Sequence, residues 1–299
     1  MKKQFILFSI LVALGLLLVA CGGAAESDGT LLGEVQSRGY LVVSTDANYE
    51  PQSFLDPNAS RAEGTVCPND LLTYGQMVGF DIDTAKGVAD ALGVEVCFAT
   101  PDWDVVTAGN WSDRWDVSIG SMTITTVRQE ILDFAHPYYY TPAQFAAAAD
   151  SGITTWDDLD GQTICVATAT TYLDWLNGEL GIPDSSIFTD PPADFEVVEL
   201  PTDQECAQAI AAGRPEFSIY LTSDTVVSSN IENGLSVVKV GDVVFSEELA
   251  PAIDKNSSFD TASFIEAVSD AIAGMHEDGT MSQLSLQWFG VDLTQDPTK

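Results

Sequence analysis

Cationic side chains are scarce in this 299-residue chain: 11 Lys and Arg stand against 45 Asp and Glu, and the formal net charge is −34 at pH 7. A surface this negative repels phosphate backbones, so we do not expect nucleic acid as a partner. Only two histidines, His136 and His276, are present, and no Cys-x-x-Cys pair occurs. The sequence therefore predicts no metal site, and nothing in it indicates a cofactor.

Motifs of the common enzyme classes are also missing. The chain contains no Gly-x-Ser-x-Gly, no His-Glu-x-x-His and no phosphate-binding loop of the Walker A type. These absences exclude the catalytic sites that such motifs mark, although a carboxylate in a cleft could still act as a general acid. We therefore predict a protein that is not an enzyme.

Long hydrophobic runs are confined to the start of the chain. Two lysines precede an apolar run at residues 5–20, which is short for a helix that crosses a hydrocarbon core of about 30 Å. A basic start, an apolar core and small residues at its end are typical of a secretory signal. We expect residues 1–20 to be a signal peptide and residues 21–30, rich in Gly and Ala, to be a flexible tether.

Cys21 directly follows Leu18-Val-Ala at the end of this run. The arrangement resembles the lipobox of bacterial lipoproteins, in which the cysteine is lipidated and becomes the first residue of the mature chain. The resemblance implies a protein outside the cytoplasm, in the periplasm or on the outer cell surface, anchored to the membrane through a lipid on Cys21. We expect its folded body to be a monomer.

The rest of the chain alternates between helix and strand patterns. Apolar residues at helical spacing predict helices at 81–92 and at about 260–277, and a last short helix that ends near Trp288. Thr171 and Thr202, each followed three residues later by an acid, predict two further helix starts. Strands are predicted at residues 41–44, 94–98, 117–119, 163–166, 219–221 and 237–240. This alternation indicates an α/β fold with largely parallel sheets.

Two breaks in the pattern suggest two lobes joined by two crossings. The first break lies near residues 141–147, and the chain returns near residues 245–251. We therefore assign residues 31–141 and 247–299 to lobe 1 and residues 142–246 to lobe 2.

Four cysteines remain besides Cys21, and an even number in an exported protein points to two disulfides. Four cysteines allow three connectivities. We favour Cys67 with Cys97 and Cys165 with Cys206, because each pair then falls within one proposed lobe.

Arg128 lies in a segment of apolar residues and small hydroxyls, with no acid between Asp116 and Glu130. It therefore has no local salt-bridge partner. A guanidinium presents five donors in a rigid fork that fits a carboxylate with two parallel hydrogen bonds. Beside Ser121 and Thr123, this arginine indicates a clamp for the carboxylate of a small molecule. The alternative is a surface arginine that pairs with a distant acid.

Several segments occur in an order that matches a known family. They are residues 45–51, 79–92, 120–128, 133–138, 278–280 and 288–290. Gly79-Phe-Asp-Ile-Asp83 and the residues after it resemble the signature of family 3 extracellular solute-binding proteins, the amino-acid receptors of ABC importers. Thr84 departs from that signature, which usually has an aliphatic residue there. The resemblance implies a two-lobed fold of the periplasmic-binding-protein type II class, with two mixed, mostly parallel sheets joined by a hinge of two crossings.

The resemblance also implies a carboxylate site. Arg128 matches the arginine that binds the α-carboxylate of the ligand in this family. In lobe 2, residues 169–171 stand where the family commonly has Gly-Thr-Thr, and the amides at this helix start would donate to the same carboxylate. The residues expected at this site are Gly120, Ser121, Thr123, Arg128, Thr168 and Thr171.

Three further positions are expected around the rest of the ligand. Tyr49 and Trp103 match aromatic positions on either side of it, where rings contact an aliphatic stem or a cation. Trp103 would also suit a hydrophobic core. Asp46 matches a position near the ligand side chain in some members, and would otherwise be a turn residue.

The ammonium-binding acid of the family is matched by Asp224, which lies three residues beyond the usual spacing. Glu216 or another acid could serve instead, and Asp224 would then be an ordinary surface residue. The expected function is a lipid-anchored substrate-binding protein of an ABC importer that holds an amino acid or a close analogue between closing lobes and presents it to a permease. A cyclohexadienyl dehydratase-like enzyme and a ligand-sensing module are the alternatives, because the fold alone does not determine the function.

Overall fold

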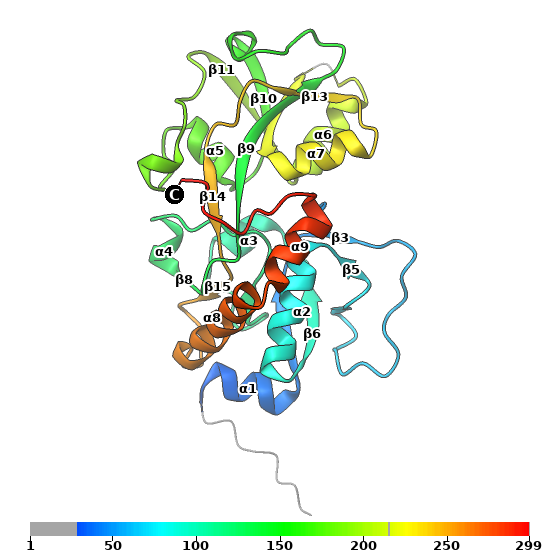
Figure 1. The fold of residues 1–299 in the computed structure, drawn as a ribbon, viewed down its shortest axis with the longest axis vertical. Coiled ribbons are helices and arrows are strands. Elements are labelled where there is room, and N and C mark those ends of the chain that lie inside the picture. The colour runs from blue at the N-terminus through cyan, green and yellow to red at the C-terminus, as the bar shows by residue number, and fades with distance from the viewer. Residues whose placement is uncertain (1–28, 215, 299) are drawn as a thin grey trace, which may run out of the picture.

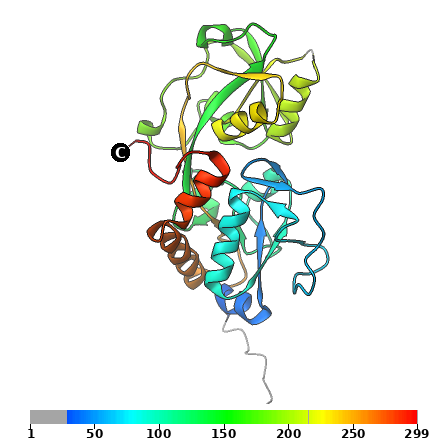
Figure 2. The same ribbon diagram turned by 45° about the vertical axis from the view of Figure 1, so that its right-hand side comes forward.

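The computed structural model describes residues 29–214 and 216–298 and has two lobes stacked along the long axis of the molecule (Figures 1 and 2). Each lobe contains one mixed sheet with helices packed against it. The predicted α/β fold with two lobes and two mixed sheets is thus confirmed. The predicted signal peptide, Cys21 and most of the predicted tether lie outside the described residues.

The lower lobe in Figure 1 contains the first sheet. Its strands are β1 (Tyr40–Ser44), β4 (Leu72–Thr73), β6 (Glu95–Ala99), β7 (Val117–Ser118), β8 (Leu132–Phe134) and β15 (Ala252–Asp254). They are arranged in the order β4-β6-β1-β7-β15-β8, with β6, β1 and β7 parallel and the outer pairings antiparallel. A small sheet of β2 (Asn48–Tyr49), β3 (Ser53–Leu55) and β5 (Met77–Val78) belongs to the same lobe.

Six helices accompany this sheet in the described part of the chain. They are α1 (Leu31–Arg38), α2 (Phe80–Leu92), α3 (Trp103–Thr107), α4 (Arg128–Ile131), α8 (Ala262–Glu277) and α9 (Thr280–Phe289). The predicted spacing in α8 is confirmed, because Phe264, Val268 and Ile272 are fully buried in the core of this lobe. Helix α2 approaches α8 closely, since a Cβ on Gly87 would lie 2.7 Å from the sulfur of Met275.

The upper lobe contains the second sheet. Its strands are β10 (Gln162–Ala167), β11 (Phe195–Leu200), β12 (Ile219–Ser223) and β13 (Val237–Val240), together with the end of β9 (Tyr139–Ala148). Helices α5 (Thr171–Leu176), α6 (Asp203–Ala211) and α7 (Asp224–Glu232) and two short 3-10 helices, η1 (Trp156–Leu159) and η2 (Asp184–Ser186), complete it. Strands β11, β10 and β12 are parallel, whereas β9 is antiparallel to β12 and β13.

Two strands connect the lobes. β9 and β14 (Ser246–Leu249) run antiparallel between the two sheets, with Leu249 opposite Tyr139 and Ser246 opposite Pro142 (Figure 1). The crossings expected near residues 141–147 and 245–251 fall on these two strands, and β9 runs through residues 141–147 without interruption. Pro142 is tolerated within β9 because it lies outside the stretch of this strand that pairs with β12. Its missing N–H therefore removes no hydrogen bond from the ladder between β9 and β12.

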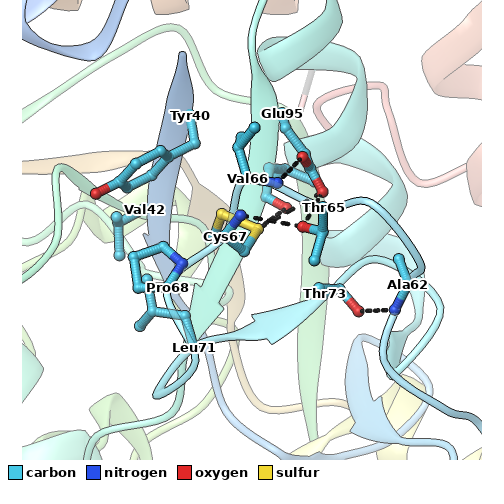
Figure 3. Close-up of a disulfide and its surroundings, with 12 residues drawn as sticks. Tyr40, Val42, Ala62, Thr65, Val66, Cys67, Pro68, Leu71, Thr73 and Glu95 are labelled. Carbon is cyan, nitrogen blue, oxygen red and sulfur yellow. Dashed lines mark hydrogen bonds between the residues drawn. A yellow bond between two sulfur atoms is a disulfide. The ribbon is translucent and has the colours of Figure 1, made fainter. Parts of the chain in front are cut away.

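Both predicted disulfides are confirmed. Cys67, in the long loop before β4, is bonded to Cys97 in β6, with 5.6 Å between their Cα atoms (Figure 3). Cys165 in β10 is bonded to Cys206 in α6, with a Cα separation of 5.8 Å. Each bridge therefore ties a loop or a helix to the sheet of its own lobe.

One predicted helix start is wrong. Thr171 does not cap α5: the N-cap residue is Thr170, and its side chain makes no capping hydrogen bond. The Thr171 hydroxyl instead donates to Glu247 Oε1 at 2.5 Å. The second predicted start is confirmed, because Thr202 and Glu205 form the expected capping box at α6. Within the described residues, no helix has the length and apolar character needed to cross a membrane.

Reduction of the disulfides should destabilise the protein, because each closes a loop in the unfolded chain. Loops of 30 and 41 residues correspond to about 3–4 kcal/mol per bridge. Urea unfolding with and without reductant measures this loss. The double variant Cys67→Ser/Cys97→Ser should show part of the loss in the absence of reductant. An unchanged midpoint in that variant would contradict a stabilising role for the bridge in the lower lobe.

Candidate functional site

A cavity of about 40 Å³ lies between the lobes. It is lined from the lower lobe by Asp46, Tyr49, Trp103, Gly120, Ser121, Thr123 and Arg128, from the upper lobe by Ala167, Thr170, Thr171, Tyr172, Pro201, Thr202 and Asp203, and from the connecting strand β14 by Glu247. Loops and helix starts at the ends of strands supply most of these residues. This is where open α/β sheets commonly bind ligands.

Arg128 is the only cationic side chain among these residues, and it is 6% exposed. Its Nη1 donates to the carbonyl oxygen of Thr123 and its Nη2 to that of Ala169, both at 3.2 Å. None of the ion pairs in residues 29–214 and 216–298 includes it. Burial lowers the pKa of the guanidinium, whereas the charges of Glu247 and Asp174 raise it. Three of its five N–H donors therefore remain for a ligand.

Aromatic side chains meet across the cavity. The Arg128 guanidinium lies 5.7 Å from the centre of the Trp103 ring, within the range of a cation–π contact. Trp103 Nε1 donates to the carbonyl oxygen of Ala169 at 3.2 Å, and the hydroxyls of Tyr49 and Tyr172 lie 3.1 Å apart. The Trp103–Ala169 and Tyr49–Tyr172 contacts join the two lobes around the site.

Hydrogen bonds to buried side chains hold the turn that precedes Arg128. Ser121 has a φ of 57°, which is uncommon for a residue with a side chain. Its N–H donates to the hydroxyl of Tyr138, and its own hydroxyl donates to Asp81, both at 2.8 Å. Tyr138 also donates to Asp81 at 2.8 Å. Burial raises the pKa of Asp81 to about 7 despite these two donors.

Glu247 is buried at the centre of the site on β14. It accepts hydrogen bonds from the hydroxyls of Thr123 at 2.6 Å and Tyr172 at 3.1 Å, besides the bond from Thr171. Burial raises its pKa, and these donors and the charge of Arg128 lower it. Its carboxylate therefore connects the hinge strand to hydroxyls from both lobes.

Asp203 is the first residue of α6 and is 7% exposed. Burial raises its pKa to about 7, and the charges of Asp46 and Glu247 add to this. The nearby hydroxyl of Thr222 favours the ionised form, yet neither that hydroxyl nor Asp203 Oδ1 makes a hydrogen bond of normal geometry within the described residues. Asp203 is therefore a buried acid with an oxygen that lacks a protein donor.

The structure brings eight of the ten predicted ligand-binding positions into this cavity. They are Asp46, Tyr49, Trp103, Gly120, Ser121, Thr123, Arg128 and Thr171. Thr168 lies in an adjoining hollow that also includes Asp46, Trp103 and Pro201.

The expected ammonium-binding acid is the exception. Asp224 begins α7 away from the cavity, and Lys239 Nζ lies 2.5 Å from its carboxylate. The alternative, Glu216, is exposed and pairs with Arg214 Nε at 3.4 Å. Both acids have a cationic partner outside the cavity. The expectation that one of them lines the ligand site is therefore wrong.

The sequence analysis missed part of the cavity lining. The missed residues are Ala167, Tyr172, Pro201, Thr202, Asp203 and Glu247, whereas Thr170 belongs to the segment 169–171 that was expected there. The capping box at Thr202 was a usable signal for Asp203, since it placed this acid in the first turn of a helix that follows a strand. No comparable local signal marked Glu247. No group of three or more His, Cys, Asp or Glu in the described part of the chain is arranged to hold a metal ion.

Comparisons with known proteins agree with this architecture. A profile described as "Bacterial extracellular solute-binding proteins, family 3" matches residues 41–291. The L-cystine-binding protein TcyJ of Escherichia coli (strain K12) is 30% identical over 271 residues, which cover 90% of each chain. The L-cystine-binding protein TcyA of Bacillus subtilis (strain 168) is 25% identical over 99% of this chain and all of its own.

A solved structure extends the comparison to the fold. It is the ancestral amino acid-binding protein AncCDT-1, described as a precursor of cyclohexadienyl dehydratase, with 28% identity and a TM-score of 0.68 over 87% of this chain and 99% of its own. The two-lobed fold, the cavity between the lobes and relatives that are named binding proteins define a solute-binding protein rather than an enzyme. The chain belongs to the bacterial extracellular solute-binding proteins of family 3.

Stability should depend on pH through Asp81 and Asp203. In the unfolded chain both titrate near their usual pKa of about 4, whereas in the folded protein both do so at about 7. Between these values the folded protein keeps protons that the unfolded chain has released. The free energy of unfolding of the ligand-free protein should therefore fall by a few kcal/mol as pH rises from about 4 to 7.

Urea unfolding at several pH values measures this slope. Asp203→Asn removes one of the two groups, so its slope should be shallower than that of the parent protein. Equal slopes would show that Asp203 is not buried as an acid with a raised pKa.

Proposed function

We propose that this protein is the amino-acid-binding component of an ABC importer and holds its ligand between the two lobes. The observation that carries the proposal is Arg128, a buried guanidinium in the interlobe cavity with no acid paired to it and three unused donors. A carboxylate would satisfy two of these donors in a bidentate pair. The similarity to the L-cystine-binding proteins TcyJ and TcyA and to the ancestral amino acid-binding protein AncCDT-1 supports an amino acid as the bearer of that carboxylate.

Other residues of the cavity complete the site in this proposal. Thr123, Thr171 and the backbone at Gly120 and Ser121 lie around Arg128 and complete the carboxylate site in this proposal. Tyr49 and Trp103 line the same cavity and contact the ligand stem. Thr168, in the adjoining hollow, borders the opening of the site.

Binding is proposed to favour closure of the lobes. Residues 31–141 and 247–299 form one rigid body in this proposal and residues 142–246 the other, and they rotate about β9 and β14. The ligand bridges Arg128 of one lobe and the start of α5 in the other, so it adds contacts that only the closed form makes. A permease would then recognise the closed form.

Replacement of Arg128 by alanine should lower the affinity for the bound amino acid at least about 100-fold, because a charge-assisted bidentate pair is lost. Isothermal titration calorimetry with the best ligand from a thermal-shift screen measures the change. Arg214→Ala is the matched control, since it removes the same charge from an exposed position outside the cavity.

Arg214→Ala should bind as the parent protein does. A variant at Arg128 with unchanged affinity would disprove the clamp, provided that its circular dichroism spectrum shows a folded protein.

Lipid anchoring is a separate part of the proposal. It is supported by the two lysines, the apolar run and the segment Leu18-Val-Ala-Cys21 at the start of the sequence. A lipid on Cys21 would keep the binding protein near the permease, which raises its effective concentration there.

Cys21→Ser should abolish incorporation of labelled fatty acid and release the protein from the membrane fraction in a bacterial expression host. The parent protein should be labelled and sediment with membranes. Labelling that survives the substitution would show that Cys21 is not the lipidated residue.

A further inference from the structure

The side chain of Glu247 is bonded to both lobes. It lies on the connecting strand β14 and is 2% exposed, whereas the next side chain of the strand, Glu248, is exposed. Glu247 Oε1 accepts one hydrogen bond from each lobe, because Thr123 of the lower lobe donates at 2.6 Å and Thr171 of the upper lobe at 2.5 Å. A single carboxylate oxygen therefore bridges the cavity.

The second oxygen, Oε2, is connected to both lobes through two tyrosines. Tyr172 donates to Oε2 at 3.1 Å, and the hydroxyl oxygens of Tyr172 and Tyr49 also lie 3.1 Å apart. Each hydroxyl has one hydrogen, and that of Tyr172 is donated to Glu247, so Tyr49 is the donor of the second bond. The series of donors thus runs from Tyr49 in the lower lobe through Tyr172 in the upper lobe to the hinge strand.

Separation of the lobes would break these bonds unequally. Thr123 is attached to β14 by its backbone, since it forms an antiparallel bridge with Leu249. Thr171 and Tyr172 begin α5, and Tyr172 is packed in the core of the upper lobe. Rotation about β9 and β14 would therefore keep the bond from Thr123 and remove the bonds from Thr171 and Tyr172.

The bonds across the cavity favour the closed arrangement. Hydrogen bonds to a charged acceptor are stronger than bonds between neutral groups, and a buried carboxylate that loses its donors is destabilised. Because the donors of Glu247 come from both sides of the cavity, their bonds oppose separation of the lobes independently of a ligand.

We propose that Glu247 is a latch between the lobes, a residue that bonds to both of them only in the closed form and thereby sets the affinity for the ligand. The proposal rests on the proposed function and deepens it, because it names the hinge residue that couples binding to closure. Glu247 acts through Thr123, Thr171 and Tyr172, so it is a positioning residue. The latch uses the hydroxyl hydrogens of Thr123 and Thr171, and Arg128 and backbone amides are then the donors to the ligand carboxylate.

Two substitutions separate the bridging oxygen from the charge. Glu247→Gln removes the charge but keeps an oxygen that can accept from Thr123 and Thr171. Glu247→Met has a side chain of similar length and removes the charge and both acceptor oxygens. The effect of the lost charge on Arg128 is common to both variants, so the difference between them reports the bridge.

Isothermal titration calorimetry with L-cystine and L-arginine measures the effect on binding. Glu247→Met should bind these amino acids about 10- to 100-fold more weakly than Glu247→Gln, as expected for the loss of hydrogen bonds that stabilise the closed form. A difference of less than about threefold between the two variants would overturn the latch and leave the proposed function intact.

Glu248→Met is the matched control, because it makes the same change at the next residue of β14. The Glu248 carboxylate is exposed and accepts from Tyr140 on the other connecting strand, outside the cavity. Glu248→Met should bind as the parent protein does.

Thr171→Val removes the bridge from the side of the upper lobe and does not depend on the folding of Glu247→Met. It should weaken binding in the parent protein. In the Glu247→Met background the same substitution should have little further effect, because the two residues share one hydrogen bond. Losses that simply add in the double variant would show that Thr171 and Glu247 act separately, which contradicts the latch.

Small-angle X-ray scattering tests the latch without a ligand. In the absence of any amino acid, Glu247→Met should have a larger radius of gyration than Glu247→Gln and the parent protein, because the open form is populated more. Equal radii would overturn the latch whether or not an amino acid binds. A larger radius in Glu247→Met together with no binding of any amino acid by the parent protein would contradict the proposed function alone.

Discussion

The structure of the site depends on one buried positive charge. Arg128 is held by two carbonyl oxygens, one from the segment just before it and one from the start of α5 in the other lobe. Carbonyl dipoles fix the orientation of the guanidinium but do not neutralise it. The charge therefore stays available for an anion, and the loops on either side of the cavity are arranged around that requirement.

The buried acids around the site differ in the groups that they contact. Glu247 lies close enough for its charge to affect Arg128, yet it is occupied by hydroxyls of Thr123, Thr171 and Tyr172. Asp81 lies beneath the turn at Ser121 and supports its geometry through Tyr138. Asp203 remains with a free oxygen. Each acid thus has a distinct environment although all are buried.

Much of the fold and one side of the site followed from local sequence. Helical spacing identified α2 and α8, and alternation identified the central strands, because each pattern reflects burial within a single element. Gly120, Ser121, Thr123 and Arg128 lie in one short segment that indicated the carboxylate site, whereas Asp46, Tyr49 and Trp103 were indicated by the family resemblance. Asp203 and Glu247 were missed because their positions depend on how distant elements meet. Asp224 was misplaced because spacing along the chain does not reveal that Lys239 on β13 pairs with it.

Both disulfides join segments of the same lobe, Cys67 to Cys97 and Cys165 to Cys206. Covalent cross-links therefore remove internal degrees of freedom from each lobe and none from the rotation of one lobe against the other. In the closure proposed above, the remaining motion would be close to a rotation of one lobe against the other about β9 and β14, which pair with each other between the two sheets. A ligand that closes such a molecule loses little conformational entropy in ordering loops, and more of its interaction energy remains as affinity.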